Sequence, residues 1–112
     1  MVSTGGTITI AQTGTTSTSF RLPDWAMFAG MLFPDMDAGA ITLQASRDGT
    51  NFYPVLDPVD GQALVVLASG SDPGWIDISD YIRFLPGNGH VRVVSATAQN
   101  TAAITIYWYC RG

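Results

Sequence analysis

One histidine, one cysteine and nine aspartates carry the proton-transfer, nucleophilic or metal-binding chemistry that this sequence offers. His90 and Cys110 are the residue types of a nucleophilic pair, in which the imidazole takes the proton of the thiol. They fall on separate predicted strands, and no motif of a known cysteine or serine nucleophile surrounds them. We therefore expect no catalytic residue and no enzymatic activity. His90 is interpreted as a histidine at a strand end, and Cys110 as a small buried hydrophobe.

The aspartates form two close pairs, Asp35 with Asp37 and Asp57 with Asp60. Paired carboxylates can do acid–base chemistry or provide oxygen ligands for calcium. All four lie in predicted turns, where Asp side chains commonly cap the backbone, and neither pair matches an EF-hand loop. Zinc needs about four ligands of the Cys or His type, and the chain offers two. The sequence therefore predicts no metal and no cofactor.

A third polar cluster, Asp48-Gly49-Thr50-Asn51, lies between two segments with strand patterns. It is either a ligand-binding loop or the corner of a β-hairpin. Asp-Gly between alternating segments is a strong hairpin signal, because both residues tolerate positive φ. The cluster has too few convergent ligands for a metal, so we interpret it as a corner. Pro54 removes one backbone donor from the returning segment, which indicates an edge strand or a bulge.

Composition favours an all-β chain. The sequence has 112 residues, 46% of them hydrophobic and only 12% charged, and all the acids are Asp and all the bases Arg. The strong helix formers Glu and Lys are absent, while β-branched and aromatic residues are plentiful. The charged share is about half that of an average protein. Partner proteins that cover much of the surface would account for this low share of charged residues.

The charge balance and the termini restrict the partners further. The net charge is −4, and five scattered arginines do not provide the basic patch that nucleic acid requires. No apolar run reaches the ~18 residues of a membrane span, and the first residues lack the regions of a signal peptide. A lone cysteine is typical of proteins that fold in a reducing cytosol. We expect no nucleic-acid partner and no membrane partner.

Alternating segments separated by turn signals predict eight or nine short strands among ten candidate segments. They lie within Thr7–Ile10, Phe20–Leu22, Trp25–Phe33, Ala40–Arg47, Phe52–Leu56, Ala63–Ala68, Trp75–Ile78, Tyr81–Leu85, His90–Ala96 and Ala103–Cys110. The apolar segment Trp25–Phe33 is expected to be buried on both sides or bent at Gly30. Residues 1–19 are expected to form a Ser/Thr/Gly-rich strand and arm, with a turn or mobile segment over Ala11–Ser19, ahead of a domain over 20–112. The predicted fold is a single antiparallel β-sandwich of jelly-roll type.

Aromatic residues on the predicted outer faces are the remaining candidates. Tyr107 and Tyr109 lie opposite the apolar face of the last strand, and Tyr81 and Arg83 lie opposite the apolar face of the Tyr81–Leu85 segment, where Ile82 and Phe84 point inward. Tyr, Trp and Arg are enriched at interaction hot spots. These four residues are therefore candidate interface residues. Loops or the N-terminal arm could instead cover them, and the same rings could stack on sugars.

Two segments resemble those of small virion proteins of tailed bacteriophages. The first is AITLQASRDGTNFYPVLDPVDG, an alternating strand followed by Ser-x-Asp-Gly-x-aromatic and a turn with Asp and Gly. The second is WIDISDYIRFLPGNGHVRVVSATAQNTAAITIYWYCRG, with a Tyr-Ile-Arg-aromatic strand, a polar loop and a closing alternating strand. The resemblance extends over Ala40–Arg111 as an ordered series of features. The aromatic closing strand and the apolar Trp25–Phe33 segment depart from the usual pattern.

The resemblance implies a non-enzymatic structural protein of the virion, assembled in the host cytoplasm. Such proteins are β-sandwiches that serve as head decoration (cement) proteins or other accessory parts. By this resemblance the chain would bind a major capsid protein or another virion protein, as a homo-oligomer with a trimer favoured. A neck, tail or baseplate position is an alternative. A carbohydrate-binding module is another, because the hairpin and the Tyr-Ile-Arg strand are similar to those of discoidin-like sandwiches.

Overall fold

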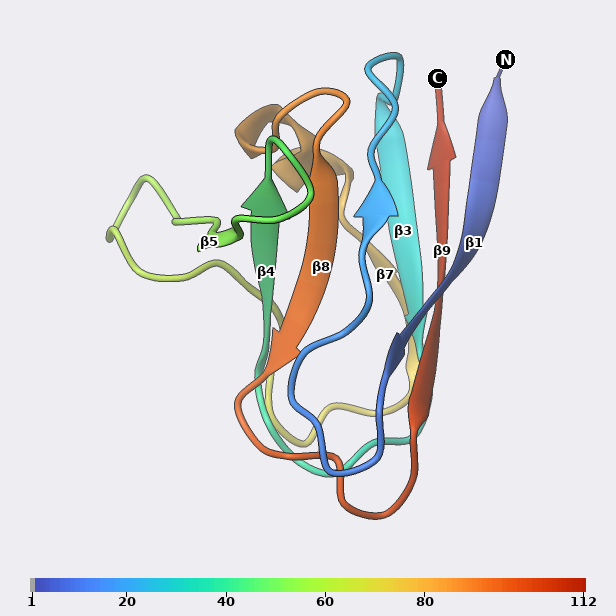
Figure 1. The fold of residues 1–112 in the computed structure, drawn as a ribbon, viewed down its shortest axis with the longest axis vertical. Coiled ribbons are helices and arrows are strands. Elements are labelled where there is room, and N and C mark those ends of the chain that lie inside the picture. The colour runs from blue at the N-terminus through green and yellow to red at the C-terminus, as the bar shows by residue number, and fades with distance from the viewer. Residues whose placement is uncertain (1) are drawn as a thin grey trace.

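Two antiparallel β-sheets packed face to face form the structure, a computed structural model that describes residues 2–112 apart from the side chain of Phe84 (Figure 1). The strands are β1 (Ser3–Ile10), β2 (Phe20–Arg21), β3 (Phe28–Phe33), β4 (Ile41–Ser46), β5 (Tyr53–Pro54), β6 (Val65–Leu67), β7 (Gly74–Asp77), β8 (His90–Ser95) and β9 (Ile104–Arg111). One 3-10 helix, η1, extends over Ser79–Phe84. Within this described part of the chain, no helix is long and apolar enough to cross a membrane.

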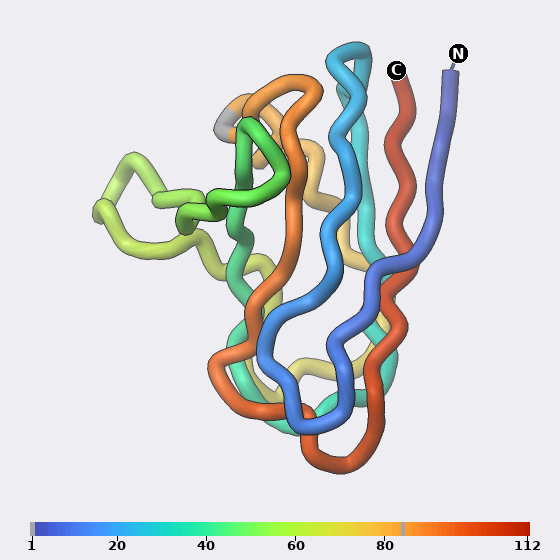
Figure 2. The backbone as a smooth tube through the Cα atoms, viewed as in Figure 1, coloured from blue at the N-terminus to red at the C-terminus, as the bar shows by residue number. Residues whose placement is uncertain are grey.

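The strand order confirms the predicted jelly roll. Sheet A has the order β1-β9-β3-β7, and sheet B has the order β2-β8-β4-β5, with β6 beside β5 on the same edge of β4. The pairings are nested: β1 with β9, β2 with β8, β3 with β7, and β4 with β5 and β6. A long hairpin wound around a barrel axis gives this nesting, which is the jelly-roll topology. Figure 2 lets the reader follow the path.

Period-two alternation places the core between the sheets. In β9, Ile104, Ile106 and Cys110 are buried, and in β8 Val91 and Val93 are fully buried. Phe33 is the largest of the fully buried side chains. Successive side chains of a strand point to opposite faces, so Trp108 and Ser95 share the inward side, while Tyr107, Tyr109 and Arg92 face outward. The apolar face expected for Ala103–Cys110 is therefore the one that packs in the core.

An aromatic stack closes the side of the sandwich where β2 is short. The rings of Phe20 in sheet B and Trp108 in sheet A are 4.2 Å apart at their centroids and nearly parallel, at 17°. Gly6 lies under the indole, and a Cβ there would be 3.3 Å from the indole Nε1. The stack therefore joins the two sheets at a point where strand pairing provides only two residues.

The segment Ala11–Ser19 has backbone hydrogen bonds to both sheets. The N–H of Ser17 donates to the carbonyl of Val93, and the N–H of Ser95 donates to the carbonyl of Thr15. On the other side, the N–H of Thr18 donates to the carbonyl of Thr9. These bonds lie on the seam between β1 and β8. The strand within residues 1–19 is longer than expected and begins at Ser3.

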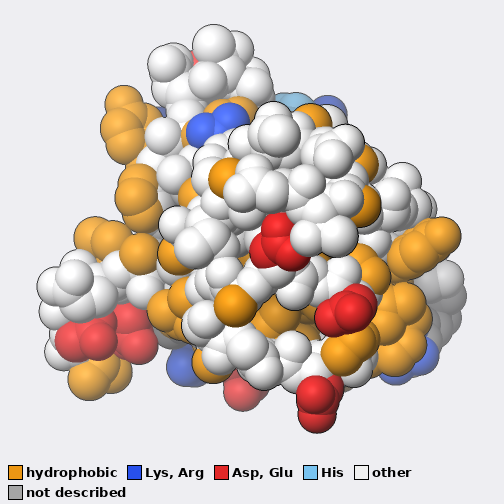
Figure 3. All heavy atoms as spheres, turned by 90° about the horizontal axis from the view of Figure 1, so that it is seen from below, with side chains coloured by type: hydrophobic (Ala, Val, Ile, Leu, Met, Phe, Trp, Pro, Cys, Tyr) orange, Lys and Arg blue, Asp and Glu red, His pale blue; other side chains and the backbone are white. Residues whose placement is uncertain are grey.

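Gln99 joins three loops at the end of the sandwich that Figure 3 faces. Its side chain is 1% exposed. The amide oxygen accepts from the N–H of Asp37 at 2.8 Å, and the amide nitrogen donates to the Asp37 carbonyl and to Ser95 Oγ. Its backbone carbonyl accepts from the N–H of Thr13. One buried residue thus fixes the loops that contain Thr13, Asp37 and Gln99 itself.

One predicted strand is wrong. Tyr81–Leu85 forms most of the 3-10 helix η1 instead, with the N–H of Tyr81 bonded to the Ile78 carbonyl and that of Leu85 to the Ile82 carbonyl. Of the two residues predicted to point inward, Ile82 is half-buried. The other, Phe84, lies outside the described side chains.

Two other strands are shorter than predicted. In the segment Trp25–Phe33 the strand begins at Phe28, and Met27 and Phe28 are exposed, so the segment is not buried on both sides. In Ala63–Ala68 the strand covers only Val65–Leu67, Ala63 makes an isolated bridge to Leu56, and Val65 is exposed. Both segments lie at the end of a sheet or lack a neighbouring strand on one side. The hydrophobicity of a segment does not indicate such a position.

Candidate functional site

The outer face of sheet A is aromatic and apolar. Strands β3, β7 and β9 point alternate residues away from the core, and we call the apolar ones the aromatic face: Phe28, Leu32, Trp75, Tyr107 and Tyr109. Trp75 is 61% exposed and Tyr107 53% exposed. Exposed aromatic residues grouped on one sheet are typical of an interaction surface, because a contact that covers them removes apolar area from water.

Strand register sets the spacing of the exposed rings. Leu32 is opposite Trp75 on one side and opposite Tyr107 on the other. The three side chains therefore form a row across β7, β3 and β9. Neighbouring strands lie about 4.8 Å apart, so the Cα atoms of Trp75 and Tyr107 are separated by about 10 Å. The row has an exposed aromatic residue at each end.

The next row of the face holds Tyr109 in a fixed position. Its ring lies on Gly30, where a Cβ would come within 2.4 Å of the ring carbon atoms. The edge of Trp75 meets the Tyr109 ring at 5.8 Å and 61°, and the Arg111 guanidinium is 5.9 Å from the ring centroid. Beside the ring is a shallow hollow of about 530 Å³, lined by Ser3, Thr4, Gly5, Trp75, Tyr109 and Arg111. Glycine at position 30 gives Tyr109 the room to lie flat.

The four candidate interface residues lie on two different elements, two on β9 and two in η1. Tyr107 and Tyr109 are on the aromatic face as expected. Tyr81 and Arg83 belong to η1, where Tyr81 is half-buried and packs against the core and Arg83 is exposed. Alternation over four residues fits a strand and a tight helical turn equally well. A role for any of the four in an interface stays a prediction.

Sequence reasoning did not single out Leu32, Phe28, Trp75 or Arg111 for this surface. The alternation of Gly74–Asp77 predicts that Trp75 and Asp77 share a side, but not which sheet they join. That assignment depends on β7 pairing with β3, about 45 residues earlier in the chain. No local signal carries this information.

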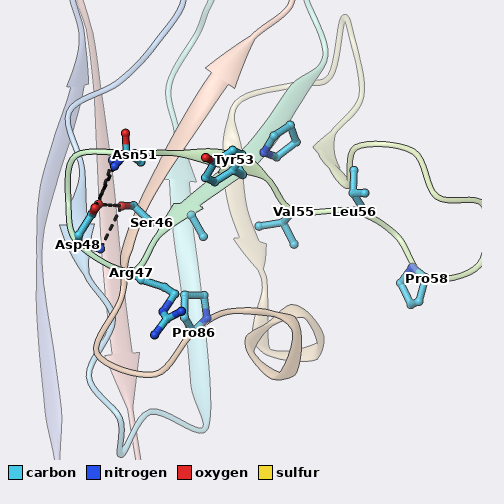
Figure 4. A pocket seen from close by; sticks show the side chains of 11 residues that line it. Ser46, Arg47, Asp48, Asn51, Tyr53, Val55, Leu56, Pro58 and Pro86 are labelled. Atoms are coloured by element: carbon cyan, nitrogen blue, oxygen red, sulfur yellow. Dashed lines mark hydrogen bonds between the residues drawn. The ribbon is translucent and has the colours of Figure 1, made fainter.

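The hairpin corner lines a second hollow, of about 840 Å³, shown in Figure 4. The corner is confirmed, because β5 pairs back onto β4 as Gln44 with Pro54 and Ala45 with Tyr53. Gly49 has a φ of +80°, the left-handed conformation that glycine adopts at no steric cost. Pro54 is on an edge strand, as expected. Apolar side chains make up much of the lining, which includes Tyr53, Val55, Leu56, Pro58 and Pro86.

Asp48 uses its carboxylate to build this corner. One oxygen, Oδ1, accepts from Ser46 Oγ and from the N–H groups of Thr50 and Asn51, at 2.8–2.9 Å. The other, Oδ2, accepts from Asn51 Nδ2 at 3.0 Å. These bonds, that from the Asn51 N–H foremost, hold the pKa of Asp48 well below its usual range. The carboxylate is thus a cap for the loop rather than a group aimed at a ligand.

We expect acid to destabilise the protein through such caps. Hydrogen bonds from Thr101 lower the pKa of Asp37, and those from Ser79 lower the pKa of Asp77, as in Asp48. A carboxyl whose pKa is lower in the folded state contributes stability above the unfolded value of about 4 and loses it as the pH falls below that value. Urea midpoints measured between pH 7 and pH 2 should therefore decline below about pH 4. Asp48→Asn should make the decline shallower, and an unchanged slope would contradict the capping role.

His90 and Cys110 are not brought together. Cys110 points into the core from sheet A and is 0% exposed, and burial raises its pKa to about 11. His90 lies on the outer side of sheet B, where its imidazole Nε2 is 3.0 Å from the position of a Cβ on Gly49. Sheet B separates the two side chains. The arrangement contains no thiolate–imidazole pair.

The thiol should accordingly be inert in the folded protein. We expect Ellman's reagent to label Cys110 at least about 100-fold more slowly in buffer than in denaturing urea, because the reaction requires an opening of the core. His90→Ala should leave the labelling rate in buffer unchanged. Rapid labelling of the native protein would show that the core is open around β9.

Asp57 and Asp60 cap their own turns, and Asp37 holds a neighbouring loop. Asp37 Oδ2 accepts from the N–H groups of Asn100 and Thr101, while Asp57 and Asp60 accept from Val59 and Gln62. Over the described residues, no group of three His, Cys, Asp or Glu side chains is arranged to hold a metal ion.

Comparisons of the chain with models of protein families, with curated proteins and with solved structures found no match. The fold therefore defines the class, a jelly-roll β-sandwich with an exposed aromatic sheet, and the function has to be argued from that surface.

Proposed function

We propose that the chain is a structural protein of a tailed-bacteriophage virion, namely a capsid decoration protein. The resemblance of Ala40–Arg111 to such proteins suggests the class. The observation that supports a binding role is the aromatic face, where Trp75 and Tyr107 expose more than half of their surface on a sheet that the fold already holds rigid. Rigid aromatic anchors lose little conformational entropy when a partner covers them.

The mechanism would be mechanical. A preformed sandwich docks across neighbouring capsid subunits through its aromatic face and holds the seam between them. Arg111 and Asp77 are placed on the same side of sheet A and would fix the orientation of the contact, since charge pairs give specificity more than affinity. Many copies on one shell make each modest contact effective through avidity.

A binding and melting experiment tests the proposal. Purified protein is added to expanded, undecorated heads of the phage whose genome encodes it, and the melting temperature of the shells is measured by calorimetry. We expect saturable binding and a higher shell melting temperature. Unchanged melting at saturating protein would overturn the decoration role. Copy number per purified particle distinguishes the positions: hundreds indicate the shell, whereas six or twelve indicate the neck or tail.

The residue-level prediction concerns Trp75. Trp75→Ala should weaken binding to the shells by about 30-fold, because truncation of a hot-spot aromatic costs about 2 kcal/mol. The matched control is Tyr53→Ala, which removes a 71% exposed ring from sheet B. Tyr53→Ala should bind like the original protein. Equal losses in the two variants would mean that the aromatic face is not the contact.

The row of exposed aromatic residues favours one second candidate, a carbohydrate-binding module. Trp75 and Tyr107, whose Cα atoms are about 10 Å apart, expose rings that could stack on the apolar faces of sugar rings in an extended glycan. A glycan array, followed by tryptophan fluorescence titration of any hit, tests this candidate. An array without hits removes it and leaves the virion proposal untouched.

A further inference from the structure

The first half of β1 is an open and unprotected strand edge. Each residue of Ser3–Thr7 is exposed, and β1 is the outermost strand of sheet A, with β9 on its inner side (Figure 1). Natural edge strands usually carry a proline, a bulge or a charge that blocks a further strand. The stretch Ser3–Thr7 has no such residue, and its register with β9 is unbroken.

Hydrogen bonds at both ends of β1 show which backbone groups face outward. The N–H of Val2 donates to the Gly112 carbonyl, and the N–H of Gly112 donates to the Val2 carbonyl, so the even-numbered residues bond to β9. The N–H of Thr9 donates to Thr18 Oγ1, and the Thr9 carbonyl accepts from the N–H of Thr18. Odd-numbered residues therefore point away from β9. Within residues 2–112, no hydrogen bond reaches the N–H and C=O groups of Ser3, Gly5 and Thr7.

We propose that a second copy of this chain pairs with this edge, antiparallel and around a two-fold axis at Gly5. The unbonded N–H and C=O groups belong to Gly5, which lies on the axis, and to Ser3 and Thr7, which lie two residues to either side of it. Antiparallel pairing about Gly5 sets Ser3 opposite Thr7 of the second copy, Gly5 opposite its Gly5, and Thr7 opposite its Ser3. All three are pairs of residues whose N–H and C=O face each other, so the free groups of one strand satisfy those of the other. The contact is isologous and closes a dimer.

The side chains on this edge permit close approach. Ser3 and Thr7 are short and uncharged, and Gly5 has no side chain at the axis. Bulky or like-charged groups there would repel a second copy, whereas a partner of strong charge would find no complement. The hollow beside Gly5, between Tyr109 and Arg111, would continue across the axis into its equivalent on the second copy. The two sheets would become one sheet of eight strands.

This inference is independent of the virion proposal, because it rests on the backbone of β1 and not on the aromatic face. A two-fold contact yields dimers, and the trimer that the resemblance favours would need another surface.

Sedimentation velocity over a range of concentrations tests the pairing. We expect reversible dimerisation of the full chain. Thr7→Pro should abolish it, since proline removes an N–H that faces the second copy and no N–H that bonds to β9. Thr7→Val keeps that N–H and should dimerise like the original. Monomers at every concentration up to about 1 mM, or dimers unaffected by Thr7→Pro, would overturn the proposal.

Cross-linking tests the register without a change in the backbone. Paired residues of antiparallel strands have Cα atoms about 5.5 Å apart, within reach of a disulfide. A mixture of Ser3→Cys and Thr7→Cys chains should therefore form a disulfide-linked dimer under mild oxidation. Each variant alone should not, because identical positions are then about 14 Å apart along the strands. Native Cys110 is buried and does not compete. Cross-linking that is no greater in the mixture than in either variant alone would overturn the register, even if Thr7→Pro fails to fold.

Discussion

Replacing the half-buried Trp108 with alanine should lower the free energy of unfolding by about 3 kcal/mol, the lower end of the range measured for large aromatic residues removed from protein cores. The indole is stacked on Phe20 across the gap between the sheets. It also lies against Gly6, so its loss would leave a cavity bounded by β1, β2 and β9. Because β2 has only two paired residues, nothing else at this seam can collapse into the space at low cost.

The measurement is urea denaturation followed by far-ultraviolet circular dichroism, which does not depend on the removed fluorophore. Trp75→Ala is the matched control, because it removes an indole that is 61% exposed, and it should change stability by less than about 1 kcal/mol. Trp108→Phe, which keeps an aromatic ring against Phe20, should recover much of the loss. If Trp108→Ala were no more destabilising than Trp75→Ala, the stack would not be what joins the sheets.

The second large effect is expected at Gln99. Gln99→Leu keeps a similar size but removes the amide that satisfies the N–H and C=O of Asp37 and contacts Ser95 Oγ. Leaving buried polar groups without partners costs about 1–3 kcal/mol for each group, so we expect a loss of about 2–4 kcal/mol. The loops at this end of the sandwich should also exchange their amide hydrogens faster.

Gln62→Leu is the matched control, since Gln62 is exposed in the loop between β5 and β6. It should be close to neutral in the same urea titration. Hydrogen exchange measured by mass spectrometry adds a local readout: Gln99→Leu should accelerate exchange in the peptides that contain Thr13 and Asp37. Unchanged exchange there, even with lower global stability, would contradict the role of Gln99 in joining the loops.

Strands with clear alternation and strong turn residues could be predicted from the sequence. The segments that became β4, β8 and β9 have several inward-facing apolar residues each, and Asp48-Gly49 and Pro86–Gly89 provide the turns between elements. The all-β class and the jelly roll followed from the number and spacing of such segments. Tyr81–Leu85 failed because its alternation is short, and so short a pattern fits a strand and a tight helical turn equally well.

The surface was only partly predictable for the same reason. The alternation of β9 places Tyr107 and Tyr109 on the outer face. Trp75 and Leu32 join them only through register between strands that are far apart in the sequence. Gln99 gave no signal at all, since a lone glutamine in a polar loop ordinarily lies in water and its burial depends on three loops meeting around it.

The nested pairing of strands has a consequence for how the protein is made. Thr4 pairs with Cys110, so the edge of sheet A cannot form until nearly the whole sequence has left the ribosome. Topologies dominated by such distant contacts have high contact order and fold slowly, in milliseconds to seconds. During synthesis the inner pairs, β4 with β5 and β6, can form first, while the segment of β1 waits unpaired for the last strand. A chaperone that shields a newly made chain would therefore act longest on its first ten residues.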